Sequence, residues 1–407
     1  MSVFQKTSAA LGAAVVFSRV FSVWTITALA DGNSIYGANQ HGEEHKWEVH
    51  AAYDCALPDR KNASKWLDFG WDLIDVLHFG GPTLFVQMDG SALWKSTSKC
   101  NPVRNSNEAA LIAHAHANEL RVLLAVHFNN SLGADMFFHF LNDDVAMKSS
   151  AHNICAKARE NDCDGISLDF EVLNTRFNTT FKGLYARYIT ILSKIAQASR
   201  LTVTPTLFMD LPKDAGVDAR DIVSSSSDGA VLMAYDYHWG CSDPAAGPNT
   251  PLIGNNGSNV NASVMWALQN NISASNLLLG VAWYGREYPT TGPEYGAPTN
   301  CTKVAADQIA RAYQAPLALH RAQTLGLGGV LWDESTLTPW YHFKDAARPW
   351  LWWEGYFDNF RSISMKYDLV TSQHLRGILI WMLNGCTRTE APDMWRALAR
   401  ARAQLRG

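Results

Sequence analysis

The sequence predicts a (β/α)8 barrel, a closed parallel sheet of eight strands surrounded by helices. Apolar runs that favour strands recur along the chain, separated by helix-like or loop segments. Strands that alternate with helices are typical of a parallel sheet. Eight such strands within 407 residues fit a single barrel. A doubly wound open sheet is the alternative, but no G-x-G-x-x-G string follows the first strand.

Each predicted element takes its place in this alternation after a short polar lead, residues 32–46. The predicted strands are Trp47–Asp54, Leu73–Phe79, Arg121–Phe128, Gly165–Glu171, Leu201–Met209, Ala230–Tyr237, Leu277–Tyr284 and Arg376–Leu383. The predicted helices include Asn107–Leu120, Ala146–Arg159, Phe181–Ser199, Val260–Asn270 and a basic closing helix within Arg396–Gly407.

The longest connection, about residues 286–374, separates the seventh and eighth strands. It is rich in tryptophan and tyrosine, including Trp332, Trp340, Tyr341, Trp350, Trp352, Trp353 and Tyr356. No repeat and no Pro/Gly/Ser-rich linker divides the chain. We therefore expect an insertion packed on the rim of the barrel, within a single domain that spans residues 31–407.

The composition is that of a globular protein and does not indicate binding to nucleic acid or membranes. The chain is 47% hydrophobic and 18% charged, with a net charge of −4. A nucleic-acid-binding protein needs a basic excess to meet phosphates, and none is present. Beyond the N-terminal segment, no stretch is long and apolar enough to span a bilayer.

The first thirty residues have the features of a secretory signal peptide. Lys6 precedes a largely apolar run, and Ala28-Leu29-Ala30 is an A-x-A cleavage pattern just before Asp31. Arg19 interrupts the run, which argues against a permanent membrane span. A cytosolic chain with an apolar N-terminus is the alternative.

Sequons and cysteines agree with export. N-glycosylation sequons occur at Asn62, Asn129, Asn178, Asn256, Asn261, Asn271 and Asn300. The cysteines are Cys55, Cys100, Cys155, Cys163, Cys241, Cys301 and Cys386, with no C-x-x-C pair, so a zinc or redox site is disfavoured. In an oxidising compartment some would form disulfides, and the odd count leaves at least one free or intermolecular.

The string D-G-I-S-L-D-F-E, residues 164–171, carries the strongest chemical signal. In a strand, successive side chains point to opposite faces, so Ser167, Asp169 and Glu171 share the face opposite the apolar residues. A hydroxyl and two carboxylates directed into one space are costly unless they have a role. The alternatives are a strand end with solvent-facing acids, or a cap for the next helix.

This string resembles the D-G-x-D-x-D-x-E signature of glycoside hydrolase family 18, the chitinase-like enzymes, with Ser167 where the first acid of the triple usually stands. Residues 233–237, M-A-Y-D-Y, are similar to the family's M-x-Y-D motif. Residues 280–285 and 375–386 resemble the G-V-P-W-Y-G and L-R-G-x-x-x-W-x-x-N-x-C strings of its di-N-acetylchitobiase branch. The resemblance spans about residues 164–395, is strongest after Leu277, and also supports the count of eight strands.

The resemblance implies a retaining glycoside hydrolase that acts on β-linked N-acetylglucosamine with substrate assistance. Glu171 would be the general acid and base, Asp169 would orient the substrate's acetamido group, and Tyr235 would assist. The implied substrate-binding residues are Asp236, Trp381, Trp283, Tyr284 and Ser167. The neutral Ser167 leaves the pH optimum open, because one coupled acid is missing.

Two other functions remain open from the sequence. An endo-acting chitinase of the same family differs in cleft shape. A catalytically inactive lectin typically lacks the terminal glutamate, and Glu171 is present. No cofactor or metal is expected: His114 and His116 lie two apart on a predicted helix and point in different directions. We expect a monomer that binds N-acetylglucosamine oligosaccharides in the lysosome or outside the cell, with no nucleic-acid or membrane partner.

Overall fold

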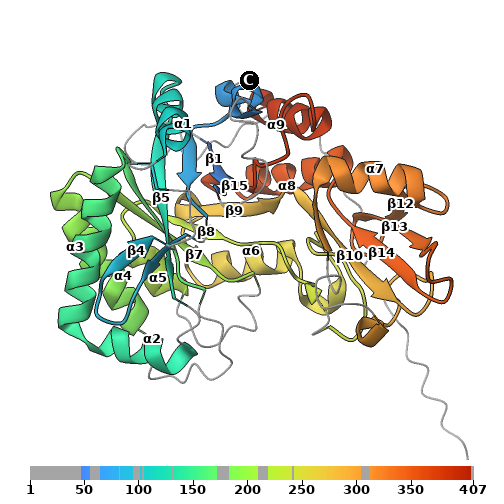
Figure 1. The fold of residues 1–407 in the computed structure, drawn as a ribbon, viewed down its shortest axis with the longest axis horizontal. Helices are drawn as coiled ribbons and strands as arrows, with labels where there is room; N and C mark the ends of the chain where they lie inside the picture. The colour runs from blue at the N-terminus through green and yellow to red at the C-terminus, as the bar shows by residue number, and fades with distance from the viewer. Residues whose placement is uncertain are drawn as a thin grey trace, which may run out of the picture. The chain divides into compact units, whose positions relative to one another are not determined.

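Eight parallel strands close into a barrel in the computed structural model of the chain (Figure 1). The structure describes residues 47–55, 65–81, 83–94, 101–102, 105–129, 133–171, 183–209, 219–240, 243–303 and 311–404. The barrel strands are β1 (Glu48–Tyr53), β2 (Val76–Phe79), β5 (Arg121–Phe128), β6 (Gly165–Asp169), β7 (Thr202–Leu207), β8 (Ala230–Leu232), β9 (Leu277–Ala282) and β15 (Gly377–Trp381). They pair in chain order, and pairings β1–β15 and β2–β5 complete the ring. The predicted barrel is therefore confirmed.

Most strand bounds follow the prediction within a few residues, and the third strand matches it at both ends. The sixth strand is the main correction, because it ends at Leu232 and not at Tyr237. Beyond it the backbone makes tight turns, with Ala234 N–H donating to Leu232 O and Tyr235 N–H to Met233 O, both at 2.9 Å. A run of apolar and aromatic residues does not reveal such a turn.

Helices surround the barrel, and several begin at side chains that cap them. The helices are α1 (Ser106–Ala117), α2 (Gly133–Asn142), α3 (Asp144–Glu160), α4 (Leu184–Ala198), α5 (Ala219–Ser225), α6 (Val260–Gln269), α7 (Ala315–Leu325), α8 (Phe360–Ser372) and α9 (Pro392–Gln404). Asn105, Asp143 and Asn259 accept hydrogen bonds from backbone N–H groups in the first turns of α1, α3 and α6. Such caps satisfy donors that the helix itself leaves unpaired.

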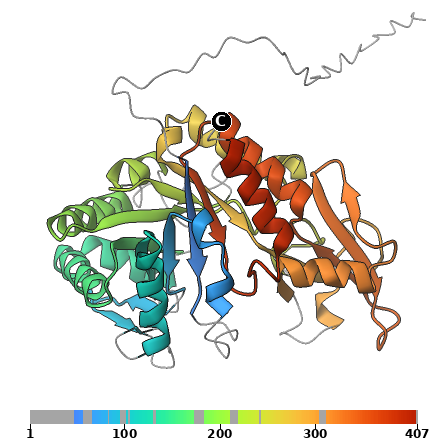
Figure 2. The same ribbon diagram turned by 90° about the horizontal axis from the view of Figure 1, so that it is seen from above.

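A five-stranded antiparallel sheet lies beside the barrel together with α7, as Figures 1 and 2 both show. Its order is β11 (Arg311–Gln314), β10 (Tyr284–Thr290), β14 (Trp352–Tyr356), β13 (Thr338–Lys344) and β12 (Leu331–Asp333). This sheet arises from the aromatic-rich connection predicted between the seventh and eighth strands. It starts at Tyr284, separated from the end of β9 only by Trp283, and α8 then leads back to β15. A separate hairpin, β3 (Leu84–Val86) and β4 (Ala92–Trp94), extends the barrel sheet beyond β5.

The barrel interior is layered. At the end where the strands begin, Glu48, Arg121, Asp228 and Arg376 form a network of ion pairs. In the middle, Val231, Leu278 and Leu379 make a small apolar cluster. The end where the strands finish carries acidic and aromatic side chains, which is where barrel enzymes place their chemistry.

Several predictions fall outside the described residues. The proposed signal peptide, residues 1–30, is among them, as are the sequons at Asn62 and Asn178 and two cysteines, Cys100 and Cys241. Cys155, Cys163 and Cys386 are buried, and none of the three forms a disulfide. None of the helices in the described part of the chain has both the length and the apolar character to cross a membrane.

Candidate active site

The acidic string takes the alternating arrangement expected of a strand. Ile166, Leu168 and Phe170 are buried in the main core between barrel and helices. Ser167, Asp169 and Glu171 face the other way, toward the barrel axis. Gly165 permits this strand to form, because a Cβ there would lie 2.4 Å from Thr202 Oγ1. The Asp164 carboxylate accepts from Val122 N at 2.8 Å, which fixes the start of β6 against β5.

Asp169 is held from both neighbouring strands. Thr206 on β7 donates its hydroxyl to Asp169 Oδ1 at 2.8 Å. His127 on β5 places Nδ1 3.4 Å from Oδ2, as the register that pairs His127 with Asp169 requires. These contacts fix the direction of the carboxylate. Neither partner was predicted as a site residue, and only the pairing of strands brings them to Asp169.

Glu171 follows Phe170 just past the end of β6, and its side chain keeps access to solvent. Its pKa is raised to about 8, first by the negative charge of Asp169, then by loss of hydration, and then by the charge of Asp236. Two close carboxylates cannot both ionise without a penalty, so the pair holds one proton at neutral pH. A carboxylic acid that stays protonated there can serve as a general acid.

Asp236 is a carboxylate whose two oxygens are both occupied by donors. Arg286 on β10 binds it at 2.7 and 2.6 Å through Nε and Nη2, and Tyr284 O–H donates to Oδ1 at 2.6 Å. The residue has φ of 60°, in the left-handed region, which turns its side chain out of the strand direction. Arg286 was missed from the sequence. Its position two residues after Tyr284, on the same face of a strand, was the available signal.

Tyr235 and Trp381 lie in one aromatic cluster beside the acids. The cluster contains Met233, Tyr235, Ala282 and Tyr284, with Phe208 and Trp381 packed against it. Gly280 makes room for the Tyr235 ring, because a Cβ there would lie 3.0 Å from Tyr235 Cε1. Burial raises the pKa of Tyr235 well above its usual value, and the charges of Asp169, Glu171 and Asp236 raise it further. The phenol is therefore a neutral hydrogen-bond donor next to the carboxylates.

Two predicted substrate-binding residues, Trp283 and Ser167, are buried in this structure. Trp283 is fully buried on the opposite face of the chain, with its indole N–H 3.2 Å from the Tyr367 hydroxyl and its ring against Trp395. Adjacent residues of an extended chain face opposite ways, so Trp283 and Tyr284 cannot both line one cleft. Ser167 is only 5% exposed and lies in the barrel interior, bonded to His78. The prediction for Trp283 is corrected, and the role of Ser167 in binding substrate stays a prediction.

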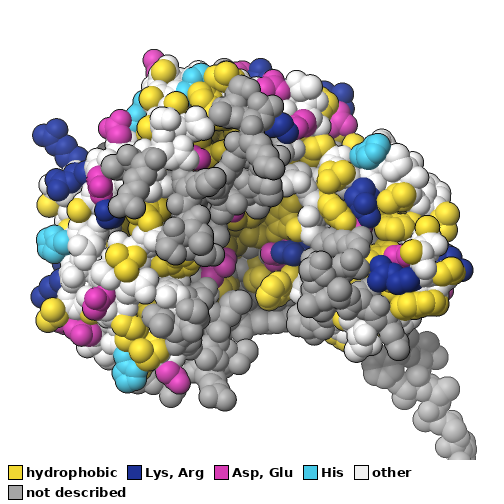
Figure 3. Space-filling model, in the orientation of Figure 1, with side chains coloured by type: hydrophobic (Ala, Val, Ile, Leu, Met, Phe, Trp, Pro, Cys, Tyr) yellow, Lys and Arg dark blue, Asp and Glu magenta, His cyan; other side chains and the backbone are white. Residues whose placement is uncertain are grey.

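One face of the molecule is hollowed. Figure 3 shows a depression in the middle of one face, with hydrophobic and acidic side chains at its floor. The described residues that come together at the ends of the strands are Asp169, Glu171, Tyr235, Asp236, Tyr284, Arg286, His127, Thr206 and Trp381. An acid, a neighbouring carboxylate and aromatic rings are suited to protonating a leaving oxygen over a sugar-sized apolar surface.

Comparison with known proteins gives the family of the chain. The chain matches the family model described as Glycosyl hydrolases family 18 over residues 78–385. It is 25% identical to di-N-acetylchitobiase of Rattus norvegicus over 361 residues, which are 79% of this chain and 89% of that protein. It is 30% identical to chitotriosidase-1 of Mus musculus over 300 residues, 65% of this chain and 58% of that protein. The match to probable di-N-acetylchitobiase 1 of Dictyostelium discoideum, 26% identical, spans 43% of this chain and 50% of that protein, so some relatives are matched over little more than half their length.

Solved structures share the fold. A Group IV chitinase of Ostrinia furnacalis in complex with allosamidin superposes with a TM-score of 0.72 and 19% identity, covering 88% of this chain and 100% of that one. A chitinase of Cycas revoluta in complex with (GlcNAc)3 gives a TM-score of 0.68 and 16% identity, again covering 88% and 100%. The family model covers most of the chain, and its span includes β6, β8, β9 and β15. The chain belongs to glycosyl hydrolases family 18.

Proposed function

We propose that this chain is a retaining glycosidase that cleaves β-linked N-acetylglucosamine in short oligosaccharides. The observation that carries the proposal is the placement of Asp169 and Glu171 on one face at the end of β6, where the charge of Asp169 raises the pKa of Glu171. The raised pKa of Glu171, about 8, suits a general acid at neutral or mildly acidic pH. A lectin would need no such proton, so the pair favours catalysis over binding alone.

The proposed mechanism uses the substrate's own acetamido group, a recognised exception to the two-carboxylate rule. Glu171 donates its proton to the glycosidic oxygen as the bond to C1 breaks. The acetamido oxygen attacks C1 and forms an oxazolinium ion. Asp169 accepts the acetamido N–H and stabilises the positive charge that develops there. Glu171, now ionised, then takes a proton from the water that opens the ring, which restores the starting state with retained configuration at C1.

Asp236 and Tyr235 are proposed to position the acetamido group. Asp236 already binds Arg286 and Tyr284, so it is a fixed point and not a mobile base. Tyr235 presents a phenol that stays protonated beside three carboxylates, and it can donate to the acetamido oxygen. Trp381, half-buried at the end of β15, supplies an apolar surface for the sugar ring.

The five-stranded sheet supports a preference for short substrates. Its strand β10 follows β9 after a single intervening residue and sends Tyr284 and Arg286 to Asp236, so the sheet borders the site directly. A wall at one end of the cleft admits a chain end and excludes the middle of a polymer. Relatives named di-N-acetylchitobiase are among those that match. An open cleft, as in an endo-acting chitinase, is the competing arrangement.

Early products from defined oligosaccharides test this proposal. Chitooligosaccharides of two to six sugars, labelled with heavy oxygen at the reducing end, are digested briefly and analysed by mass spectrometry. We expect single labelled N-acetylglucosamine units from the shortest substrates, and slow action on chitin, because only chain ends enter. Internal dimers released from long chains at comparable rates would instead identify an endo-acting chitinase. Binding without any turnover would identify a lectin.

Entry into the secretory pathway, ending in the lysosome or outside the cell, completes the proposal. Support comes from the A-x-A pattern before Asp31 and from sequons that the fold leaves accessible, since Asn256 and Asn271 are exposed. Because Cys155, Cys163 and Cys386 are buried outside any disulfide, the other four cysteines are the ones that can form disulfides.

Mass spectrometry of protein from a eukaryotic host checks export. We expect an N-terminus near Asp31 and a mass that falls on treatment with an enzyme that strips N-glycans. Replacing Asn256 and Asn271 by Gln should each remove one glycan, while Asn270→Gln, outside any sequon, should remove none. An intact Met1 with no mass change would contradict export.

A further inference from the structure

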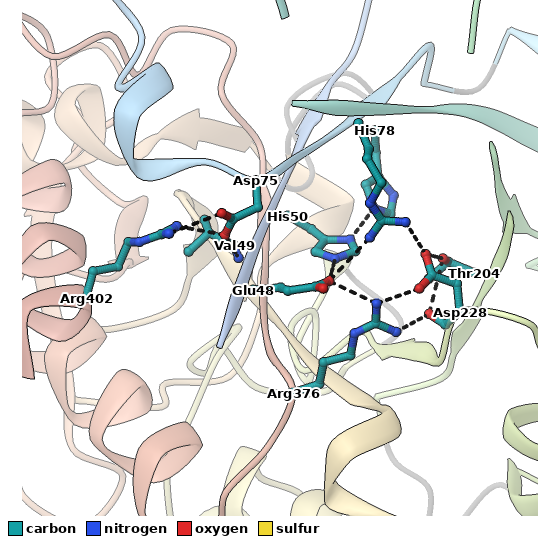
Figure 4. A network of polar contacts seen from close by, with 10 residues as sticks. Glu48, Val49, His50, Asp75, His78, Thr204, Asp228, Arg376 and Arg402 are labelled. Atoms are coloured by element: carbon teal, nitrogen blue, oxygen red, sulfur yellow. Dashed lines mark hydrogen bonds and ion pairs between the residues drawn. The ribbon is translucent and has the colours of Figure 1, made fainter. Parts of the chain in front are cut away.

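A chain of four polar residues crosses the barrel interior below the acids. Glu48 Oε2 lies 3.0 Å from His50 Nε2, His50 Nδ1 lies 2.8 Å from His78 Nε2, and His78 Nδ1 lies 2.8 Å from Ser167 Oγ. Figure 4 shows Glu48, His50 and His78 in succession. Both histidines and Ser167 are buried, with exposures of 0%, 4% and 5%. The chain ends on the residue that replaces the first acid of the family's triple.

Glu48 is held as a carboxylate at the far end of this chain. Burial alone would raise its pKa, but the hydrogen bond from His50 and the charges of Arg376 and Arg121 lower it to about 2. Arg376 Nη2 lies 2.9 Å from the same oxygen that faces His50, and Arg121 Nη2 lies 3.4 Å from it. Across the physiological range Glu48 can therefore only accept hydrogen bonds.

A single ionised acid then decides the direction of every hydrogen bond in the chain. Burial lowers the pKa of His50 and lowers that of His78 well below its usual value, so both rings are neutral and each carries one proton. His50 must donate from Nε2 to Glu48, which leaves Nδ1 as an acceptor. His78 must then donate from Nε2, which leaves its Nδ1 as an acceptor. Ser167 completes the chain by donating its hydroxyl proton to His78.

We propose that Glu48 is a positioning residue for the active centre: through His50 and His78 it turns the Ser167 hydroxyl proton away from the acids, so that Ser167 offers them only oxygen lone pairs. Asp169 is the next side chain along the same face of β6. The groups that face the Asp169 carboxylate are then the Thr206 hydroxyl, which donates to it, and His127 Nδ1, which lies 3.4 Å from Oδ2. The charge of Asp169 is the main cause of the raised pKa of Glu171.

The same direction accounts for the serine at this position. A carboxylate at 167 can only accept, and it would face the lone pair of His78 Nδ1. A carboxylate at 167 could pair with His78 only if every hydrogen bond from Glu48 to position 167 reversed its direction, or if a buried histidine gained a second proton. Burial opposes such a charged histidine. Ser167 and His78 are therefore matched to each other.

The direct test is the tautomer of the two histidines in the wild-type protein, which does not depend on the proposed enzymatic function. With ¹⁵N-labelled histidine and assignment through NOEs to strand neighbours, NMR distinguishes protonated from bare ring nitrogens. We expect His50 and His78 both to carry a single proton, on Nε2, between pH 7 and 8. A proton on Nδ1 of either ring, or a charged ring within that range, overturns the direction of the chain.

Two variants of Glu48 separate positioning from mere packing. Glu48→Gln keeps an oxygen that Arg376 and His50 can share, so both rings should keep the proton on Nε2. Glu48→Met removes that acceptor, and the chain should reverse to Nδ1 protonation, freeing Ser167 to donate to Asp169. Asp75→Asn is the matched control. Asp75 is another partly buried acid, which accepts from Val49 N and pairs with Arg402. It lies apart from the histidines in Figure 4. It should leave both tautomers unchanged.

The functional readout rests on the proposed glycosidase activity and is kept separate from the NMR result. The titratable groups around Asp169 and Glu171 are His127, Tyr185, Tyr235 and Asp236, and none is altered by these variants. In Glu48→Met, a hydrogen bond from Ser167 to Asp169 should lower the pKa of Glu171 and move the alkaline limb of kcat/KM down by ~0.5–1 pH unit. Glu48→Gln should restore the wild-type limb. Reversed tautomers with an unmoved limb would overturn the positioning role.

Discussion

Replacing Glu171 by Gln is expected to reduce hydrolysis by at least ~10²–10⁴-fold, the range that general acid catalysis contributes. The substitution keeps the shape of the side chain but removes an acid at the end of β6 whose pKa is raised to about 8. Oligosaccharide binding should persist, because Asp236, Tyr284 and Trp381 are untouched. Turnover of a chromogenic chitooligosaccharide, together with calorimetric binding, measures both effects.

Glu334→Gln is the matched control for this variant. Glu334 lies in the insertion, its side chain is 74% exposed, and its partner Arg361 is 3.5 Å away at the surface. The same chemical change there should leave turnover unchanged. Near-normal activity of Glu171→Gln would show that another group is the acid. The wild-type profile gives a second check: a general acid with a pKa of about 8 loses its proton, and the enzyme its activity, as the pH rises through that value.

Hydrolysis is expected to vanish when the sugar at the cleaved position carries an amine in place of the acetamido group. If that group is the nucleophile, its loss removes an intramolecular reaction whose effective molarity is ~10⁵–10⁸ M, so the rate should fall by at least ~10⁵-fold. Defined chitooligosaccharides with one glucosamine at the cleaved position provide the comparison. A thiazoline that mimics the oxazolinium ion should also bind ~10²-fold or more tightly than substrate, as analogues of high-energy species do.

The matched substrate control places the glucosamine at a position that is not cleaved. That oligosaccharide should be hydrolysed near the normal rate, which separates loss of the nucleophile from weaker binding. Equal rates for the two isomers would rule out substrate assistance and point to a protein nucleophile. Among the described acids at the site, Asp169 is the one adjacent to Glu171, so it would become the next candidate to test.

The local pattern of the chain determined the barrel and the orientation of its central acids. The period-two alternation of residues 164–171 sends Ile166 and Leu168 to the core and Asp169 to the barrel axis, because a strand has no other way to arrange them. The same rule, applied strictly, excludes Trp283 from the cleft once Tyr284 lines it. The sequence carried that information, and the resemblance to a known motif obscured it.

Contacts between distant parts of the chain could not be obtained in this way. Arg286 reaches Asp236 across 50 positions, and His78 reaches Ser167 across 89. No period or motif encodes such pairs, since they depend on which strands become neighbours and on the register between them. The early end of β8 at Leu232 belongs to the same class, because the turn that follows it serves to direct Asp236 toward β10.

The sequence by itself determined the fold class and the family, because alternation and a short motif are local properties of the chain. Only the tertiary structure decided which acid of the site is protonated and in which direction its hydrogen bonds run. Glu171 keeps its proton because Asp169 and Asp236 converge on it, and Ser167 is a donor because Glu48, 119 positions earlier, is ionised by arginines at the opposite end of the barrel. Electrostatic energies depend on distance and burial, and both are set by how the strands close on one another.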